Sequence, residues 1–183
     1  MKKIVLPSII IGFVLFLWQF ISYAAGDFHS KQHQYTPKQD SIKQVINEMD
    51  LARGSYMIPS VKPGTPMDKA QSEWNELKNE PWMFVTYYGT EHAEMAPAMI
   101  RGFLCDIILG LLLMLLLNAI GPITTMRSVI MAVSVGLITF IYFPYTNGIW
   151  YPQFDIWASF VDAIVPFAII GIINARFWNR QKM

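Results

Sequence analysis

Residues 107–117 read Ile-Ile-Leu-Gly-Leu-Leu-Leu-Met-Leu-Leu-Leu, and this run decides what kind of fold the chain adopts. It lies in a gap of 20 residues, between Asp106 and Arg127, that holds no Asp, Glu, Lys or Arg. Two more such gaps follow Lys3 and Arg127 and are 23 and 27 residues long. About 20 residues of apolar helix cross the ~30 Å hydrocarbon core of a bilayer. The sequence therefore predicts a protein that spans a membrane several times.

The composition of the 183 residues supports a membrane location. Hydrophobic residues make up 54% of the chain and charged residues 15%, whereas a soluble domain has roughly 25% charged residues. The net charge of +1 gives no reason to expect nucleic acid as a partner. The single cysteine excludes a disulfide framework. These values exclude an ordinary soluble domain and a disordered chain, and they make the lipid bilayer the first expected partner.

The predicted fold class is a membrane all-α four-helix bundle with a small inserted α+β extracytoplasmic domain. We expect spans at residues 1–25, 97–120, 128–143 and 154–177, a domain at residues 26–96, and a basic tail at residues 178–183. Pro144 and the Asn147-Gly148 turn should end the third span. A cleaved signal peptide is the alternative for the first span. Its apolar stretch is, however, longer than a usual signal core of roughly 7–15 residues.

The charges around the short connections predict the orientation. With the N-terminus in the cytoplasm, the cytoplasmic segments carry six basic residues and no acidic residue, while the short connection at residues 144–154 carries no Lys or Arg. This is the positive-inside pattern. The six basic residues are Lys2, Lys3, Arg127, Arg176, Arg180 and Lys182. We therefore expect a multi-pass protein of the bacterial inner (plasma) membrane with both termini in the cytoplasm.

The segment at residues 26–96 carries signals for helix, strand, helix and strand in that order. Thr36-Pro37 and Thr65-Pro66 each suit the start of a helix. Residues 55–60 and 82–88 suit strands because they are rich in aromatic and β-branched residues or end at a proline. A domain of about 60 residues buries little of its surface on folding. We therefore expect it to rest on the membrane helices or on a partner.

A set of polar residues within the spans is the strongest pointer to function, because such residues are costly in a bilayer. At 1.5 Å per residue, they all fall in the outer half of the membrane. Asp155 and Asp162 are seven residues apart and share a helix face. Arg101 is better placed to pair with one of them than with Asp106. The set forms either a structural network or a polar pocket open to the outside, and its members are Gln19, Arg101, Asp106, Thr139, Asp155 and Asp162.

Two groups of residues suggest a metal site only weakly. His29 and His33 are four residues apart, a spacing that suits a divalent metal on one helix face. Glu91 and His92 form the second group, at the outer boundary of the second span. The simpler interpretation of His29 and His33 is that both are solvated. No cofactor is expected.

Aromatic residues crowd the outer connection between the third and fourth spans. They form either the usual interfacial belt or a docking rim over the polar set, and they include Tyr145, Trp150, Tyr151 and Trp157. Small residues at Ala132 and Gly136, and again at Gly171 and Ala175, permit close helix packing. Their spacing does not distinguish packing within one chain from a homo-oligomer.

Four stretches resemble a group of small, uncharacterised bacterial four-span membrane proteins with an extracytoplasmic loop domain. They are residues 35–40, 56–60, 99–102 and 143–147. The resemblance implies no activity, and it suggests that Arg101 and the Tyr145–Asn147 turn belong to one outer-surface feature. The chain carries no nucleotide-binding loop, no His-Glu-x-x-His motif and no nucleophile elbow.

Three classes of function remain. The first is a non-enzymatic accessory or assembly protein that binds a partner protein or lipid through its outer domain. The second is a small-ligand or ion-binding membrane protein, or a transporter, that uses Arg101, Asp106 and Asp162. The third is a membrane-embedded enzyme, which would need polar groups that converge in an open pocket. The sequence favours the first class.

Overall fold

The computed structural model describes residues 2–90, 94–119, 121 and 123–179. The chain divides into two compact units. Unit 1 comprises Met1–Gln34 and Glu94–Met183, and unit 2 comprises Tyr35–Ala93. Each unit is described by itself below.

Unit 1 contains four helical segments that are long and apolar enough to cross a membrane: Ile4–Ala25, Met95–Ala119, Thr125–Trp150 and Ile156–Phe177. They are built from α1 (Lys2–Phe20) with the π-helical turn η1 (Ile21–Ala25), α4 (Met95–Ala119), α5 (Thr125–Phe140) and α7 (Ile156–Asn179). The turn η2 (Ile141–Tyr145) and the short helix α6 (Thr146–Trp150) extend α5. The protein is thus a multi-pass membrane protein by the length and composition of its helices.

The third span is longer than the sequence predicts, because it continues through Pro144. Proline has no N–H and crowds the carbonyl four residues before it. The chain accommodates Pro144 by widening into the π-helical turn η2, a common form of local helix distortion. The hydroxyl of Thr146 donates to the carbonyl oxygen of Ile141 at 2.6 Å, and its backbone N–H bonds to the same oxygen. The helix therefore ends at Trp150 rather than before Asn147.

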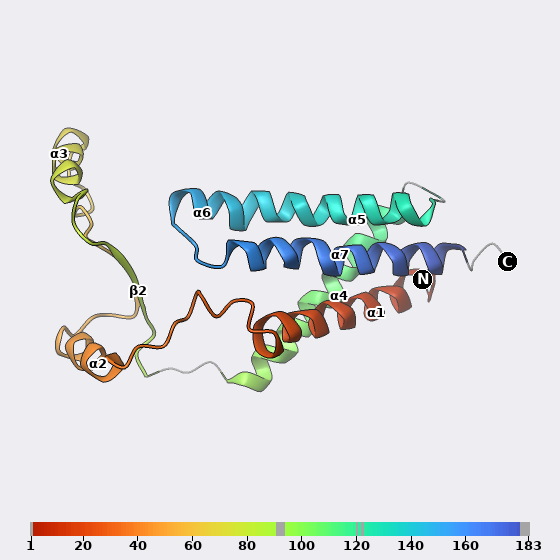
Figure 1. The fold of residues 1–183 in the computed structure, drawn as a ribbon, viewed down its shortest axis with the longest axis horizontal. Helices are drawn as coiled ribbons and strands as arrows, with labels where there is room; N and C mark the ends of the chain where they lie inside the picture. The colour runs from red at the N-terminus through yellow and green to blue at the C-terminus, as the bar shows by residue number, and fades with distance from the viewer. Residues whose placement is uncertain (1, 91–93, 120, 122, 180–183) are drawn as a thin grey trace. The chain divides into compact units, whose positions relative to one another are not determined.

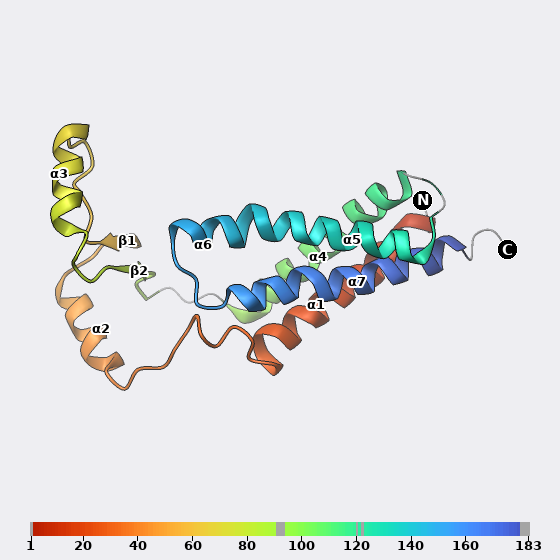
Figure 2. The ribbon, with the colours of Figure 1, turned by 45° about the horizontal axis from the view of Figure 1, so that its top comes forward.

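The membrane helices pack as two pairs, α1 against α4 and α5 against α7, and the pairs meet where α1 lies beside α7. Figure 1 shows α5, α7 and α1 side by side with α4 crossing at an angle, and Figure 2 shows the same arrangement from a tilted view. A core of apolar side chains from α1, α4 and α7 fills the centre. Its fully or largely buried members are Ile11, Leu15, Leu113, Met114, Phe167 and Ile170.

Glycines set how closely the helices of each pair approach. A Cβ atom on Gly136 would lie 2.0 Å from the carbonyl oxygen of Ala163, and one on Gly110 would lie 2.6 Å from that of Ser8. Real Cβ atoms essentially never come this near to another atom. Ala132 and Ala175 are completely buried. The small residues noted in the sequence therefore serve packing within the chain, between α5 and α7.

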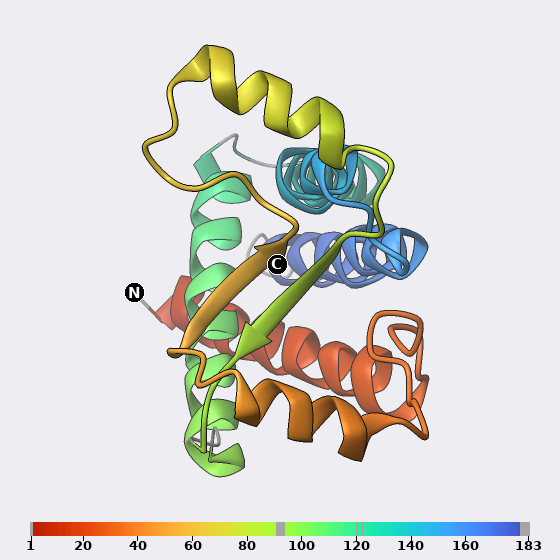
Figure 3. The same ribbon diagram turned by 90° about the vertical axis from the view of Figure 1, so that its left-hand side faces the viewer.

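Unit 2 consists of α2 (Gln39–Glu48), β1 (Gly54–Ile58), α3 (Met67–Leu77) and β2 (Met83–Tyr87). This is the order of elements that the sequence predicts, although α2 begins later than the Thr36-Pro37 start. The two strands pair antiparallel, with Gly54 opposite Tyr87 and Ile58 opposite Met83. Figure 3 shows the strand pair with α2 and α3 at opposite ends of it. No described residue of unit 2 is buried, so its apolar surfaces remain partly open.

Candidate functional site

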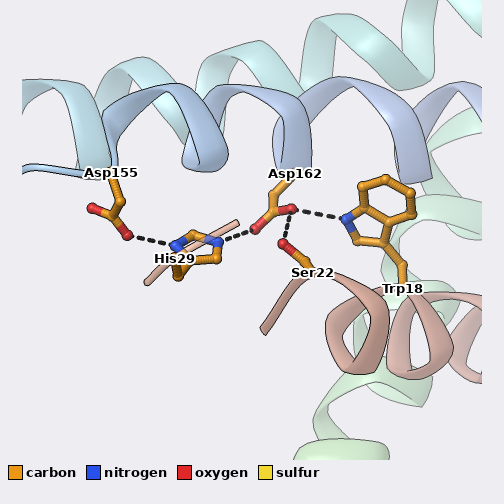
Figure 4. A network of polar contacts seen from close by, with 5 residues as sticks. All are labelled: Trp18, Ser22, His29, Asp155 and Asp162. Carbon is orange, nitrogen blue, oxygen red and sulfur yellow. Dashed lines mark hydrogen bonds and ion pairs between the residues drawn. The ribbon is translucent and has the colours of Figure 1, made fainter. Parts of the chain in front are cut away.

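A histidine lies between two aspartates in unit 1 (Figure 4). The Nδ1 atom of His29 is 2.5 Å from Oδ2 of Asp155, and its Nε2 atom is 2.9 Å from Oδ2 of Asp162. The side chains of His29 and Asp155 are 4% and 3% exposed. That of Asp162 is 24% exposed. We call Trp18, Ser22, His29, Asp155 and Asp162 the polar cluster.

The other oxygen of Asp162 binds the first span. Oδ1 accepts a hydrogen bond from Nε1 of Trp18 at 2.9 Å and one from the hydroxyl of Ser22 at 2.7 Å. The ring of Tyr23 stacks on His29, with the ring centroids 3.9 Å apart and an angle of 2° between the planes. The Asp162 carboxylate thus contacts Trp18, Ser22 and His29, which lie within one short stretch of chain. These contacts join the end of the first span to α7.

Local structure places His29 at this point. The π-helical turn η1 ends at Gly26, whose N–H donates to the carbonyl of Ile21, and the N–H of Phe28 donates to the carbonyl of Ser22. The chain then turns through residues 28–32 instead of continuing as a helix. This reversal returns the imidazole to the layer of Ser22. Asp155 lies just before α7 and Asp162 lies within it, and their seven-residue spacing presents both carboxylates on the same side, as the sequence predicts.

The contacts of His29 fix the number of protons in the cluster. An ionised carboxylate can only accept a hydrogen bond. Each of the two His29 contacts therefore needs one proton, so the imidazole and the two carboxyl groups together hold two protons. Burial lowers the pKa of His29, but the hydrogen bonds to Asp155 and Asp162 and their negative charge outweigh it. The net result is a pKa raised above the ordinary value of about 6.5. The raised pKa favours the imidazolium form of His29. The two protons give the cluster a net charge of −1 whichever of the three groups holds each of them.

A separate polar pair lies between α1 and α4. The side-chain N–H of Gln19 donates to Oδ1 of Asp106 at 2.9 Å. Asp106 is buried, and its Oδ2 has no hydrogen-bond partner in the described part of the chain. The predicted polar set thus divides into two places, one with Asp106 and Gln19 and one with Asp155 and Asp162. Depth in the membrane groups all four residues, but it does not show which way each helix faces.

Among the described residues, Arg101 forms no ion pair with an aspartate of the fourth span, although the sequence favours such a partner over Asp106. Arg101 is exposed on α4, and among the described residues it forms no ion pair. The physical reason is that α4 packs against α1 rather than α7. His29 and Trp18 supply the donors that Asp162 requires. Neither residue belongs to the polar set predicted from the sequence, in which His29 is named only as a candidate metal ligand.

The metal hypothesis gains no support from the histidines that the structure describes. His29 is buried in a turn and His33 is exposed, so the two do not share a helix face. Glu91 and His92 lie outside the described residues. The described residues include no group of three or more His, Cys, Asp or Glu side chains that could hold a metal ion.

A pocket of about 330 Å³ lies beside the polar cluster. Asp162, Thr139 and Ser159 are its polar members. The hydroxyl of Thr139 donates to the carbonyl of Gly136 at 2.7 Å, so its oxygen remains able to accept. The remaining wall is aromatic and apolar, formed by Tyr23, Phe140, Phe143, Pro144, Ala163 and Phe167. The structure therefore joins Asp162 and Thr139 of the predicted set in one open pocket.

No family model, curated protein or solved structure matches the chain. What the site can do has to follow from its own chemistry. The cluster carries net negative charge, the pocket has no Lys or Arg in its lining, and one carboxylate reaches the pocket surface. Such a pocket attracts a cation or a hydrogen-bond donor and repels an anion.

The aromatic residues of the outer connection stay exposed. Trp150 is 72% exposed and Trp157 is 77% exposed, while Tyr145 and Tyr151 are about half exposed. Phe140 lies near Tyr145, with the ring centroids 5.8 Å apart. Tyr145 therefore neighbours a residue of the pocket wall, although none of the four rim residues belongs to the described lining of the pocket.

A groove of about 350 Å³ in unit 2 is the second feature that a ligand or partner can use. It lies between α2 and the strand pair. Apart from Lys38 and Ser41, every residue in its lining is apolar, and these are Ile42, Val45, Ile46, Met49, Leu51, Ile58, Met83 and Val85. Val45 is 49% exposed and Met83 is 50% exposed. The apolar face of α2 is therefore only partly covered by the rest of unit 2.

Proposed function

We propose that the protein is a non-enzymatic accessory protein that binds an apolar segment of a partner protein in the groove of unit 2. The observation that carries this proposal is the groove itself. Eight apolar side chains line it, and unit 2 has no buried residue of its own among those described. Burial of apolar surface stabilises by about 25 cal/mol per Å². A partner that covers the groove would supply the core that unit 2 lacks.

The proposed orientation places unit 2 outside the cytoplasm of a bacterial cell, as a domain inserted between the first two spans of an inner-membrane protein. The positive-inside pattern supports this orientation, because Arg127 and Arg176 lie at one end of the bundle while the connection at residues 144–154 carries no basic residue. The seven Lys and Arg residues within 26–96 do not oppose it, because long loops cross the membrane largely regardless of charge.

Photocrosslinking in the native cells tests partner binding. A photoreactive residue at Val45, in the groove, should give a discrete protein adduct, and one at Asn47, on the other face of α2, should not. The adducted protein should also co-purify with the wild-type chain in mild detergent. Val45→Asp should reduce co-purification, and the matched Asn47→Asp should leave it unchanged. Adducts to lipid alone, or equal adducts at both positions, would refute the proposal.

A second candidate function is the binding of a small ligand by the membrane unit. The specific observation that favours it is the pocket into which Asp162 opens, where charged and aromatic groups meet. The imidazole and carboxylates behind it hold that carboxylate in place. The candidate uses Asp162, as the sequence suggests, but without Arg101 and Asp106.

A further inference from the structure

We propose that the pocket beside Asp162 binds a quaternary ammonium group. This inference rests on the second candidate function and names its ligand class, and it is independent of partner binding by unit 2. The residues that carry it are the carboxylate of Asp162 and the aromatic wall formed by Tyr23, Phe140 and Phe143.

The sign of the ligand's charge follows from the polar cluster. Two carboxylates share two protons with one imidazole, so the cluster keeps a net charge of −1 whichever of the three groups holds each proton. No Lys or Arg lines the pocket to balance this charge. A cation at Asp162 would complete the charge balance, whereas an anion would meet an uncompensated carboxylate.

The kind of cation follows from the hydrogen bonds that Asp162 already makes. Its Oδ1 accepts from Trp18 and Ser22, and its Oδ2 accepts from His29. A carboxylate oxygen has about two lone-pair sites, so only Oδ2 retains a free one. A primary ammonium has three N–H groups to satisfy, and a bare metal ion needs several oxygen ligands. A quaternary ammonium needs none of these bonds and suits a site that offers few acceptors.

The aromatic wall suits the same cation. Aromatic rings attract quaternary ammonium groups through their negative faces, and this attraction grows where the site is desolvated. Phe140 is held by edge contact with Phe160, with the centroids 5.3 Å apart, and the Tyr23 ring is held by its stacking on His29. The volume of about 330 Å³ accommodates a trimethylammonium group with a short substituent.

Calorimetric titration of the full chain in detergent tests the ligand class. Choline is the probe, and 3,3-dimethylbutan-1-ol, which has the same shape without the charge, is its control. Choline should bind and the alcohol should not. If both bind equally, the ligand class is wrong while small-ligand binding stands. If neither choline nor the alcohol binds, and phosphatidylcholine does not raise the thermal stability of the chain either, the second candidate function is refuted as well.

The ligand can come from a soluble molecule or from a lipid headgroup, and a second arm separates the two. The chain is placed in nanodiscs of phosphatidylcholine or of phosphatidylglycerol. A headgroup site predicts higher thermal stability in phosphatidylcholine and loss of choline binding there by competition. A site for a soluble ligand predicts equal choline binding in both lipids.

Matched variants locate the binding. Phe143→Leu removes a largely exposed ring from the pocket wall and should weaken choline binding by about twofold to fivefold. Tyr142→Leu removes a neighbouring exposed ring that does not line the pocket, and it should leave binding unchanged. Asp162→Asn should abolish binding, and a folded Phe143→Leu variant keeps the test decisive if Asp162→Asn fails to fold. Equal binding by the wild type and Phe143→Leu would overturn the site.

Discussion

The Nε2 atom of His29 lies 2.9 Å from Oδ2 of Asp162, although 133 positions separate the two residues. His29 follows the first span and Asp162 is inside the last, so this contact joins the two ends of the membrane unit. Its partner on the other side, Asp155, lies just before α7. The imidazole therefore fixes both the position of the chain after the first span and the rotation of α7. The stability of the membrane unit should depend on this one side chain.

Replacement of His29 by Gln should destabilise the protein strongly. It removes the only cationic group that faces Asp155 and Asp162 within the described residues, and breaking a buried ion pair typically costs about 3–5 kcal/mol. The measurement is thermal or denaturant unfolding of the purified chain in detergent. His33→Gln is the matched control, because His33 is exposed in a turn. Similar unfolding of both variants would contradict the structural role of the bridge.

The stability that His29 provides should also depend on pH. Its pKa is raised in the folded state, because the hydrogen bonds to Asp155 and Asp162 outweigh the effect of burial. The unfolded chain therefore loses this proton first, at about pH 6.5. The contribution is fully present below that pH and is lost as the pH rises through the raised pKa. Unfolding temperatures measured from about pH 6 upward should fall in the wild type more than in His29→Gln, and parallel curves would contradict the prediction.

The main features of the membrane unit could be predicted from the sequence because they follow from local patterns. Gaps without charges reveal the apolar helices, and small residues at fixed spacing mark Ala132 and Gly136 as points of close helix packing, although the spacing does not identify the partner helix. The spacing of Asp155 and Asp162 also predicts correctly that they share a face, since both contact one imidazole. These features depend on residues within a few helical turns of one another.

The composition of the polar cluster could not be predicted in the same way. The depth of a residue in a membrane does not reveal how its helix is rotated or which helix lies next to it, so depth alone does not identify the partner of Arg101. His29 follows the first span in a polar stretch, and such a position favours a solvated histidine. The sequence does contain one signal for its position. His29 follows Ser22 by only seven residues, so a tight turn after the first span brings the imidazole back to the depth of Ser22. The π-helical turn at Pro144 depends on backbone geometry that a proline alone does not specify.

Replacement of Gly136 by Ala should separate α5 from α7. The added Cβ atom would lie 2.0 Å from the carbonyl oxygen of Ala163, a rigid backbone atom that cannot rotate away. Overpacking of this kind costs about 1–3 kcal/mol, and the unfolding temperature in detergent should fall. Gly102→Ala is the matched control, because a Cβ atom there has no neighbour within 4 Å. If the two alanine variants unfold alike, the helices do not meet at Gly136.

The proposed orientation predicts which side of the membrane each connection faces. In a Cys105→Ser background, which removes the only cysteine, single cysteines are placed at Gln44 in unit 2, at Trp150 at the end of α6, and at Met126 at the start of α5. All three native side chains are exposed. In intact cells, a maleimide that cannot cross the inner membrane should label the cysteines at 44 and 150, because both positions lie outside the cytoplasm. The cysteine at 126 should react only after the membrane is opened, since Arg127 holds that connection on the cytoplasmic side.

Labelling of position 126 in intact cells, with 44 and 150 protected, would show that the chain is inserted the other way round and would place the groove of unit 2 in the cytoplasm.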